Sequence, residues 1–229
     1  MGQIADLYFA GRHGLLDLAA TLSDDDARTK VPATPGWTVK DVYAHLTGTV
    51  ADALSGRMDG VATEPWTARQ VAERADRSLT EICAEWAELG PELEEALRAF
   101  PEIANPRLVI DQWTHEQDLR GALGKPGART DGRMTFCVDT LLTGFSRAWR
   151  ETDLPFVVVT GDSGEWLLGD GIVRVRLTAP DFELGRALVG RRSRSQVLAM
   201  RWTPSDEAAI APVVDHLHAF PYAPEDLLE

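Results

Sequence analysis

The chain is short of cysteine and has no long apolar runs. Only Cys83 and Cys137 occur in 229 residues, and their separation matches no zinc or redox motif. Both stand at apolar helical positions, so we interpret them as buried structural thiols in a reducing cytoplasm. No apolar stretch approaches the roughly 20 residues that a membrane-spanning helix needs. The N-terminus lacks the basic and apolar regions of a signal peptide, and none is expected.

Positive charge is scarce as well. Lysine and arginine together number 23 against 36 acidic residues, which gives a net charge of −13 and a pI near 4.8. Nucleic acids and anionic membrane surfaces bind to basic faces, so neither is expected as a partner. The hydrophobic fraction of 44% is that of an ordinary globular protein. Small molecules therefore remain the expected partners, and the sequence gives no indication of an oligomeric state.

Helical periodicity dominates the first 150 residues. Apolar side chains recur at helical spacing over 3–22, 38–54, 67–89, 106–123 and 133–150, with a short helix near 91–99. Thr38 is the expected N-cap of the second helix, with Asp41 as its capping-box partner, and Thr67 with Gln70 is expected to begin the third. Gly90-Pro91 is expected to end that third helix. Long amphipathic helices with short links predict a helical bundle.

After residue 152 the period of the pattern changes. Residues 156–160 form a β-branched run, and 172–178 alternate apolar residues with arginine, as a half-buried strand does. We interpret GDSGEW and LGDG as turns, and helical spacing returns at 181–189 and 195–202. The predicted fold is therefore α+β, with a four-helix bundle at 1–151 and a small α+β domain at 152–229.

Three polar side chains interrupt the apolar stripes of the predicted bundle. His45 lies between Val42 and Leu46, so it points inward, while Asp111 and His115 are four residues apart on one helix face. A buried carboxylate beside an imidazole needs a partner, because an unpaired buried charge is costly. A shared divalent cation satisfies all three groups. Two imidazoles and one carboxylate suit zinc, and three ligands leave positions open, as in catalytic sites.

The spacing alone leaves other interpretations open. Asp111 and His115 equally fit a buried ion pair, with His45 bonded separately to a backbone carbonyl. Asp41 and His45 repeat the same spacing, but capping explains Asp41 better because it lies in the first turn of its helix. Three further histidines are interpreted as unrelated to the site: His13, His216 and His218.

Two segments resemble a known family. TPGWTVKDVYAHLTG (34–48) and DQWTHEQDLRGALG (111–124) are similar to the metal-binding segments of the DinB-like superfamily, closest to its mycothiol-dependent maleylpyruvate isomerase branch. DFELGRALVGRRS (181–193) resembles the small C-terminal domain of that branch. The resemblance implies zinc held by His45, Asp111 and His115, and Asp118 is a candidate for orienting a ligand. The branch typically has glutamate where this chain has Asp111, which is shorter by one methylene.

The resemblance also implies the chemistry. Zinc would hold the sulfur of mycothiol, the thiol cosubstrate, as a thiolate that attacks a small electrophile. The expected function is that of a metal-dependent mycothiol S-transferase or isomerase acting on a small, carboxylated electrophile, as in maleylpyruvate isomerase. Two alternatives are kept. One is a metal-dependent hydrolase with Glu116 as its general base, and the other is a non-catalytic binding or stress-response member, which Asp111 favours.

Arginines gather in one C-terminal stretch. Residues 184–205 contain five and no acidic residue: Arg186, Arg191, Arg192, Arg194 and Arg201. Arginine pairs with carboxylates through two parallel hydrogen bonds, and Arg191, which follows Gly190 after a predicted helix, is the preferred ligand of a substrate carboxylate. The alternative is a solvated patch that pairs with the acidic bundle. Trp37 and Trp113 are expected to line the cavity. For Trp113, a place in the hydrophobic core is the preferred alternative.

Overall fold

The computed structural model describes residues 2–229, so residue 1, the first of the predicted bundle domain, lies outside the described residues. Its contacts divide the chain into two compact units, one reaching Gly127 and including Glu229, the other spanning Ala128–Leu228. Within the described part, no helix combines the length and the apolar character needed to cross a bilayer. The elements of the first unit are α1 (Gln3–Ala19), α2 (Asp24–Arg28), α3 (Val39–Ser55), α4 (Glu64–Ala72), α5 (Leu79–Ala99), the 3-10 turn η1 (Pro101–Ile103) and α6 (Arg107–Leu123).

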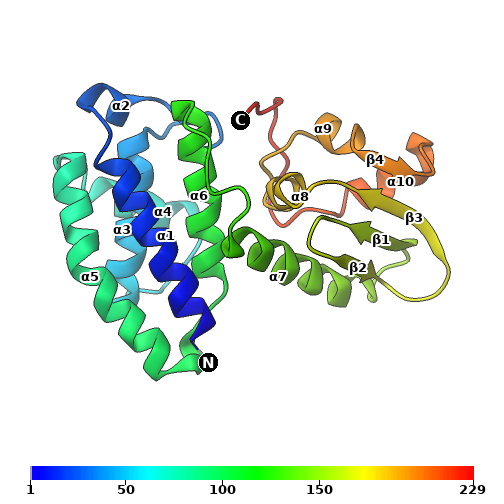
Figure 1. Cartoon of the computed structure of the whole chain (residues 1–229), viewed down its shortest axis with the longest axis horizontal. Helices are drawn as coiled ribbons and strands as arrows, with labels where there is room; N and C mark the ends of the chain where they lie inside the picture. The colour runs from blue at the N-terminus through cyan, green and yellow to red at the C-terminus, as the bar shows by residue number, and fades with distance from the viewer. Residues whose placement is uncertain (1) are drawn as a thin grey trace. The chain divides into compact units, whose positions relative to one another are not determined.

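The long helices α1, α3, α5 and α6 form the main body of the first unit (Figure 1). The helices α1 and α3 each pack against both α5 and α6, which closes a four-helix bundle. Large aromatic side chains fill its core, and their polar atoms are bonded there: Tyr43 donates to the carbonyl of Leu15, and Trp86 donates to the hydroxyl of Tyr8. The predicted bundle is confirmed, with α2 and α4 as short additional helices.

The start of α3 determines which of its residues face the bundle. The Thr38 hydroxyl accepts from the backbone N–H of Asp41 at 3.2 Å, and the Asp41 carboxylate accepts from the N–H of Thr38 at 2.8 Å. This capping box is the one the sequence predicted. It satisfies two N–H groups that otherwise have no helical partner, so α3 begins at Val39 and His45 lies buried two turns later.

The prediction of the third helix was wrong at both ends. Gly90-Pro91 does not end a helix, because α5 runs through it to Ala99. A Cβ on Gly90 would lie 2.3 Å from Nε of Arg12, whose guanidinium forms a buried ion pair with Glu94 at 2.8 Å. The glycine therefore serves the close approach of that pair rather than helix termination. The capping box of α5 is formed by Ser78 and Glu81, not by the predicted Thr67 and Gln70.

The second unit contains a four-stranded sheet and four helices (Figure 1). Its strands have the order β2-β1-β3-β4, with β1 parallel to β3 and both outer pairs antiparallel. The predicted strands at 156–160 and 172–178 are confirmed, although β2 lies in a segment interpreted as turns. The elements are α7 (Gly132–Trp149), β1 (Phe156–Thr160), β2 (Glu165–Leu168), β3 (Val173–Thr178), α8 (Asp181–Leu188), α9 (Arg194–Leu198), β4 (Arg201–Thr203) and α10 (Glu207–Val214).

The helix α7 belongs by packing to this second unit. Its residues Val138, Leu142 and Trp149 lie in the same hydrophobic cluster as the inward side chains of the sheet. The chain therefore divides between Gly127 and Ala128, earlier than the predicted boundary at 151/152. The helical periodicity of α7 has the same form as that of the bundle helices, so the sequence pattern could not show which core its apolar face joins.

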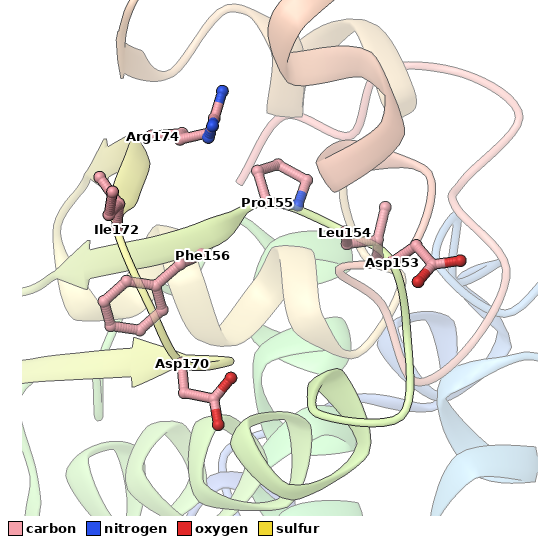
Figure 2. A pocket seen from close by; sticks show the side chains of 7 residues that line it. All are labelled: Asp153, Leu154, Pro155, Phe156, Asp170, Ile172 and Arg174. Carbon is pink, nitrogen blue, oxygen red and sulfur yellow. The ribbon is translucent and has the colours of Figure 1, made fainter.

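A surface hollow of about 510 Å³ lies at one end of the sheet (Figure 2). Phe156 and Ile172 contribute its apolar wall, and Ile172 is 80% exposed. The remaining lining residues are Asp153, Leu154, Pro155, Asp170 and Arg174. None of the residues predicted to bind metal or substrate lines this hollow.

We predict that Thr38→Ala lowers the free energy of unfolding by about 1 kcal/mol, because the N–H of Asp41 loses its acceptor. Urea denaturation followed by circular dichroism measures the change. Thr38→Ser keeps the hydroxyl and is the matched control, so its stability should stay near that of the wild type. Equal stabilities of the alanine and serine variants would show that the capping box does not stabilise α3.

Candidate metal centre

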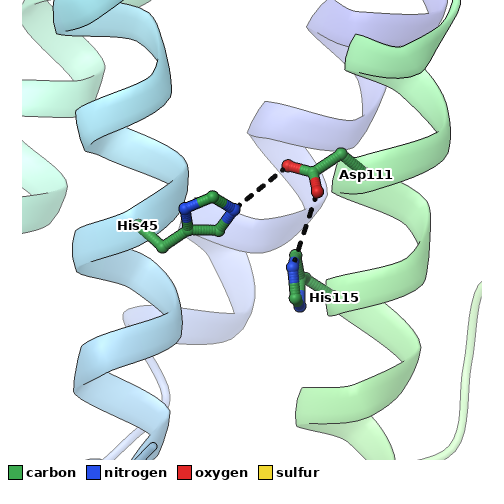
Figure 3. A group of neighbouring side chains, drawn as sticks. All are labelled: His45, Asp111 and His115. Atoms are coloured by element: carbon green, nitrogen blue, oxygen red, sulfur yellow. Dashed lines mark ion pairs between the residues drawn. The ribbon is translucent and has the colours of Figure 1, made fainter. Parts of the chain in front are cut away.

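The structure brings the three predicted ligands together between two helices (Figure 3). His45 lies on α3, and Asp111 and His115 lie on α6. The Asp111 carboxylate points between the two imidazoles. Its Oδ2 is 3.4 Å from Nε2 of His45, and its Oδ1 is 3.5 Å from Nε2 of His115. One ligand atom from each residue lies within 4.8 Å of the other two.

The two histidines are buried and the carboxylate is partly open. The side chains of His45 and His115 are 4% and 9% exposed, whereas that of Asp111 is 39% exposed. Trp37 closes over both imidazoles, with its ring centre 5.2 Å from that of His45 and 6.0 Å from that of His115. Trp66 of α4 meets His45 edge-on at 6.2 Å. The centre is thus shielded by aromatic rings but reachable from solvent at Asp111.

His115 has a second carboxylate partner at its other ring nitrogen. Nδ1 of His115 lies 3.1 Å from Oδ2 of Asp118, whose side chain is fully buried. With the Asp118 carboxylate as the acceptor of this bond, Nδ1 of His115 carries the proton. Asp118, which the sequence suggested as an orienting group, holds the ring in this way.

His45 is held by a residue that the sequence analysis assigned to another role. Nδ1 of His45 lies 2.8 Å from Oε1 of Gln70, a fully buried side chain of α4. The ion-pair alternative expected a backbone carbonyl at this position, and the structure has the side-chain amide instead. Gln70 was expected to cap a helix starting at Thr67, but it lies near the C-terminal end of α4. Trp66 and Gln70, one turn apart, are the buried residues of α4, and only the structure shows this.

The hydrogen-bond partners at Nδ1 determine that the Nε2 atom of each ring faces Asp111 without a proton. A neutral imidazole carries one proton, and in both rings that proton is engaged at Nδ1. Both Nε2 atoms then direct lone pairs toward the carboxylate oxygens of Asp111, so three acceptors converge. Such a group is stable only around a cation, which is either a metal ion or an added proton.

The pKa of His45 reflects the same attraction for positive charge. Burial by itself lowers the pKa of this imidazole, but the nearby Asp111 carboxylate and the bond to Gln70 outweigh that effect, so the pKa is raised above 6.5. A proton and a metal ion compete for the same Nε2.

The spacing of the donor atoms suits a small divalent ion. With zinc–ligand distances of about 2.0–2.1 Å, tetrahedral donors lie about 3.3 Å apart. Each Nε2 lies about this far from one of the two Asp111 oxygens, at 3.4 and 3.5 Å, and one ligand atom of each residue lies within 4.8 Å of the other two. The aspartate at position 111, although shorter than glutamate, reaches both imidazoles. The residues present therefore fit a metal with three protein ligands and an open position.

Other candidate residues have different partners. Glu116 accepts from Arg120 at 2.9 Å and its side chain is buried, so it does not stand ready as a general base. Trp113 fills the core, as expected. The remaining histidines lie apart from the centre, and two of them bond to backbone carbonyls after α10 has ended: His216 and His218.

Two members of the arginine stretch are engaged within the second unit. Arg192 pairs with Glu183 at 2.7 Å, and Arg194 pairs with Asp215 at 2.6 Å. Arg191 is half-buried, and its Nη1 donates to the carbonyl of Val189 at 3.3 Å. The acidic partners of these two arginines thus come from the second unit and not from the bundle, as the alternative had expected. Binding of a substrate carboxylate by Arg191 stays a prediction.

Comparison with known proteins agrees with this geometry. The family model of the mycothiol maleylpyruvate isomerase N-terminal domain matches residues 8–124, just over half of the chain, including all three candidate ligands. The chain belongs to this family. Membership confirms the resemblance that the ligand segments carry, and the expected α+β architecture is confirmed as well.

Two solved structures share the fold of this family member. One is a histidine mutant of the mycothiol-dependent maleylpyruvate isomerase, with 12% identity, a TM-score of 0.56, and coverage of 89% of this chain and 93% of that one. The other is the mycothiol-dependent maleylpyruvate isomerase itself, with 11% identity, a TM-score of 0.51, and coverage of 82% and 88%. No curated protein matched. Identities this low show the fold alone.

Neither cysteine of the chain is expected to act as the nucleophile. Burial raises the pKa of the half-buried Cys83 to about 12, and it raises that of the buried Cys137 well above the ordinary value. At neutral pH the Cys83 thiol is therefore protonated and a poor nucleophile. We predict that a thiol-specific chromogenic reagent labels neither cysteine in the folded protein and labels both after denaturation.

The time course of labelling at neutral pH measures this. Cys83→Ser is the matched control, because it shows which thiol accounts for any signal. Rapid labelling of Cys83 in the folded protein would mean that the chain supplies a reactive thiolate of its own.

Proposed function

We propose that this protein is a metal-dependent enzyme that uses mycothiol as its nucleophile against a small, carboxylated electrophile. The observation that carries the proposal is the convergence of two imidazole lone pairs and one carboxylate, each imidazole being held at Nδ1 by a side-chain oxygen. The ligand set supports a divalent ion, with zinc as the proposed metal. Family membership supports the thiol.

Each side chain of the centre would have a separate role. His45 and His115 would hold the ion through Nε2, and Asp111 would supply the one negative charge among the three ligands. A divalent ion bound here would keep a coordinated thiol sulfur deprotonated at neutral pH. Trp37 and Trp66 would exclude water from the buried side of the centre, which protects the thiolate from reprotonation. The exposed edge of Asp111 marks where thiol and substrate would enter.

The proposed reaction is an addition to an activated double bond. The thiolate forms a carbon–sulfur bond, and the electron pair of the double bond moves to the adjacent carbonyl. Rotation about the resulting single bond, followed by breaking of the carbon–sulfur bond, returns the thiolate and gives the isomer. If the adduct is instead protonated and released, the thiol is consumed and the protein is a transferase.

The geometry favours a thiol over water as the nucleophile. A hydrolase needs a general base beside the ion, and the residue suggested for it, Glu116, is bonded to Arg120. No specific contact of the described residues supports the hydrolase, and the fit of Asp111 to both imidazoles speaks against loss of the centre in a purely binding protein.

We predict that the protein binds one zinc ion per chain and consumes or recycles mycothiol with maleylpyruvate only when the metal is present. His45→Ala and Asp111→Ala should each weaken metal binding by more than about 100-fold, because each removes one of three ligands. Titration with a competing chelator measures affinity, and chromatography of thiol and products separates isomerase from transferase. His216→Ala removes a histidine outside the centre and should bind and react like the wild type.

Two outcomes would contradict the proposal. If both ligand variants still bound metal as tightly as the wild type, His45 and Asp111 would not be the metal ligands. Turnover of the electrophile at the same rate without mycothiol would leave the metal but exclude the thiol, in favour of a metal-dependent hydrolase.

We further propose that Arg191 binds the substrate carboxylate. Arg191→Ala should raise KM for a carboxylated electrophile by roughly 10-fold or more, since it removes a charge-assisted pair, while leaving an uncharged electrophile unaffected. Steady-state kinetics with both substrates measure the difference, and Arg194→Ala, which breaks the exposed pair with Asp215, is the control. Equal effects on charged and uncharged substrates would exclude this role.

A further inference from the structure

A buried carboxylate lies behind the metal centre on the same helix as His45. Asp52 is seven residues after His45 on α3, and its side chain is completely buried. Three groups surround it: Nε2 of Gln70 donates to Oδ2 at 2.8 Å, Arg69 donates to Oδ2 at 2.8 Å, and Arg57 lies 2.8 Å from Oδ1. Oδ2 of Asp52 thus accepts from both Gln70 and Arg69, and its Oδ1 forms an ion pair with Arg57.

The Asp52 carboxylate determines how Gln70 is oriented. Its Oδ2 is the acceptor in this contact, so the Gln70 amide turns its NH₂ group toward Asp52. Its carbonyl oxygen then necessarily faces His45, where it can only accept. His45 must therefore place its proton on Nδ1, and the lone pair of Nε2 is left pointing at Asp111.

We infer that Asp52, acting through Gln70, is a positioning residue that holds His45 in the Nδ1–H tautomer and so makes Nε2 the metal-binding atom. The inference deepens the proposed function and rests on it for its consequence in metal binding. The tautomer itself is a property of the metal-free chain.

The packing of α4 on α3 keeps this relay in register. Gly48 lies opposite Gln70, and a Cβ there would come within 2.5 Å of Cβ of Gln70, so only glycine admits the glutamine at this depth. Trp66 of α4 donates to the carbonyl of Arg57 at 3.1 Å. These two contacts hold the short helix against the end of α3.

The two histidines of the centre are thus oriented by different means. His115 donates directly to a carboxylate, Asp118, whereas His45 donates to a neutral amide that is itself oriented by a carboxylate. The relay keeps the negative charge of Asp52 one side chain away from His45 and beside two arginines. Asp52 therefore sets the direction of the hydrogen bond without adding its charge to the metal ligands.

Asp52→Asn tests the inference with little change in volume. Asparagine can offer either its oxygen or its NH₂ group, so Gln70 is free to turn and His45 to place its proton on either nitrogen. The Nε2–H tautomer should appear in the metal-free variant, and zinc affinity should fall by about 10- to 100-fold. Nitrogen-15 NMR of the histidine rings, at a pH where His45 is neutral, measures the tautomer. Chelator competition measures the affinity.

Two further variants separate positioning from simple loss of stability. Gln70→Met removes the relay while filling the same space, so it should reproduce both effects, and combining it with Asp52→Asn should weaken binding no further, because the two residues act in series. Glu73→Gln breaks the outer pair with Arg57 without touching Gln70. It is the matched control and should keep the tautomer and the affinity of the wild type.

The outcomes are distinct from those of the proposed function. If Asp52→Asn and Gln70→Met both retain the Nδ1–H tautomer and bind zinc within about twofold of the wild type, the inference is overturned. If the wild type binds no metal, the proposed function fails, yet the NMR comparison in the metal-free proteins still decides the role of Asp52. Should Asp52→Asn not fold, Gln70→Met carries the test.

Discussion

The centre depends on the direction of two hydrogen bonds, those from Nδ1 of His45 and of His115. Each has an oxygen acceptor that cannot donate in its place, so both rings turn a lone pair toward Asp111. If either ring were reversed, Nε2–H would donate to the carboxylate and the site would be a closed ion pair. Whether these residues form a metal site or an ordinary buried salt bridge is therefore decided by the residues that hydrogen-bond to the two imidazoles.

The residues that orient the two histidines come from one bundle helix and from one short helix beside the bundle. Asp118 comes from α6 itself, three residues beyond His115, whereas Gln70 comes from α4, a short helix outside the four long ones. Buried polar groups on this scale are stable only when every member is bonded. Asp52 meets this condition at Oδ2, which accepts from Gln70 and Arg69, while its Oδ1 lies in an ion pair with Arg57.

Family membership and the aspartate at position 111 are compatible for a geometric reason. The branch typically has glutamate there, which suggested a weakened site. In this chain, the Asp111 oxygens lie 3.4 and 3.5 Å from the two imidazoles, close to the spacing of tetrahedral zinc ligands. With identities of 11 and 12% to the solved isomerases, shared fold and donor set are what relate these proteins. The identity of the substrate is part of the proposed function and does not follow from this structural similarity.

The sequence by itself determined the local features: most of the bundle helices, the capping box at Thr38, and the placement of His45, Asp111 and His115 on two helix faces, because these follow from periodicity and short-range hydrogen bonds. Only the tertiary structure decided that α5 continues through Gly90-Pro91, that α7 joins the second core, and that Gln70 orients His45. Each of these depends on contacts between residues distant in sequence, such as Arg12 with Glu94. Hydrophobic periodicity reports only local structure, so it could not predict such contacts.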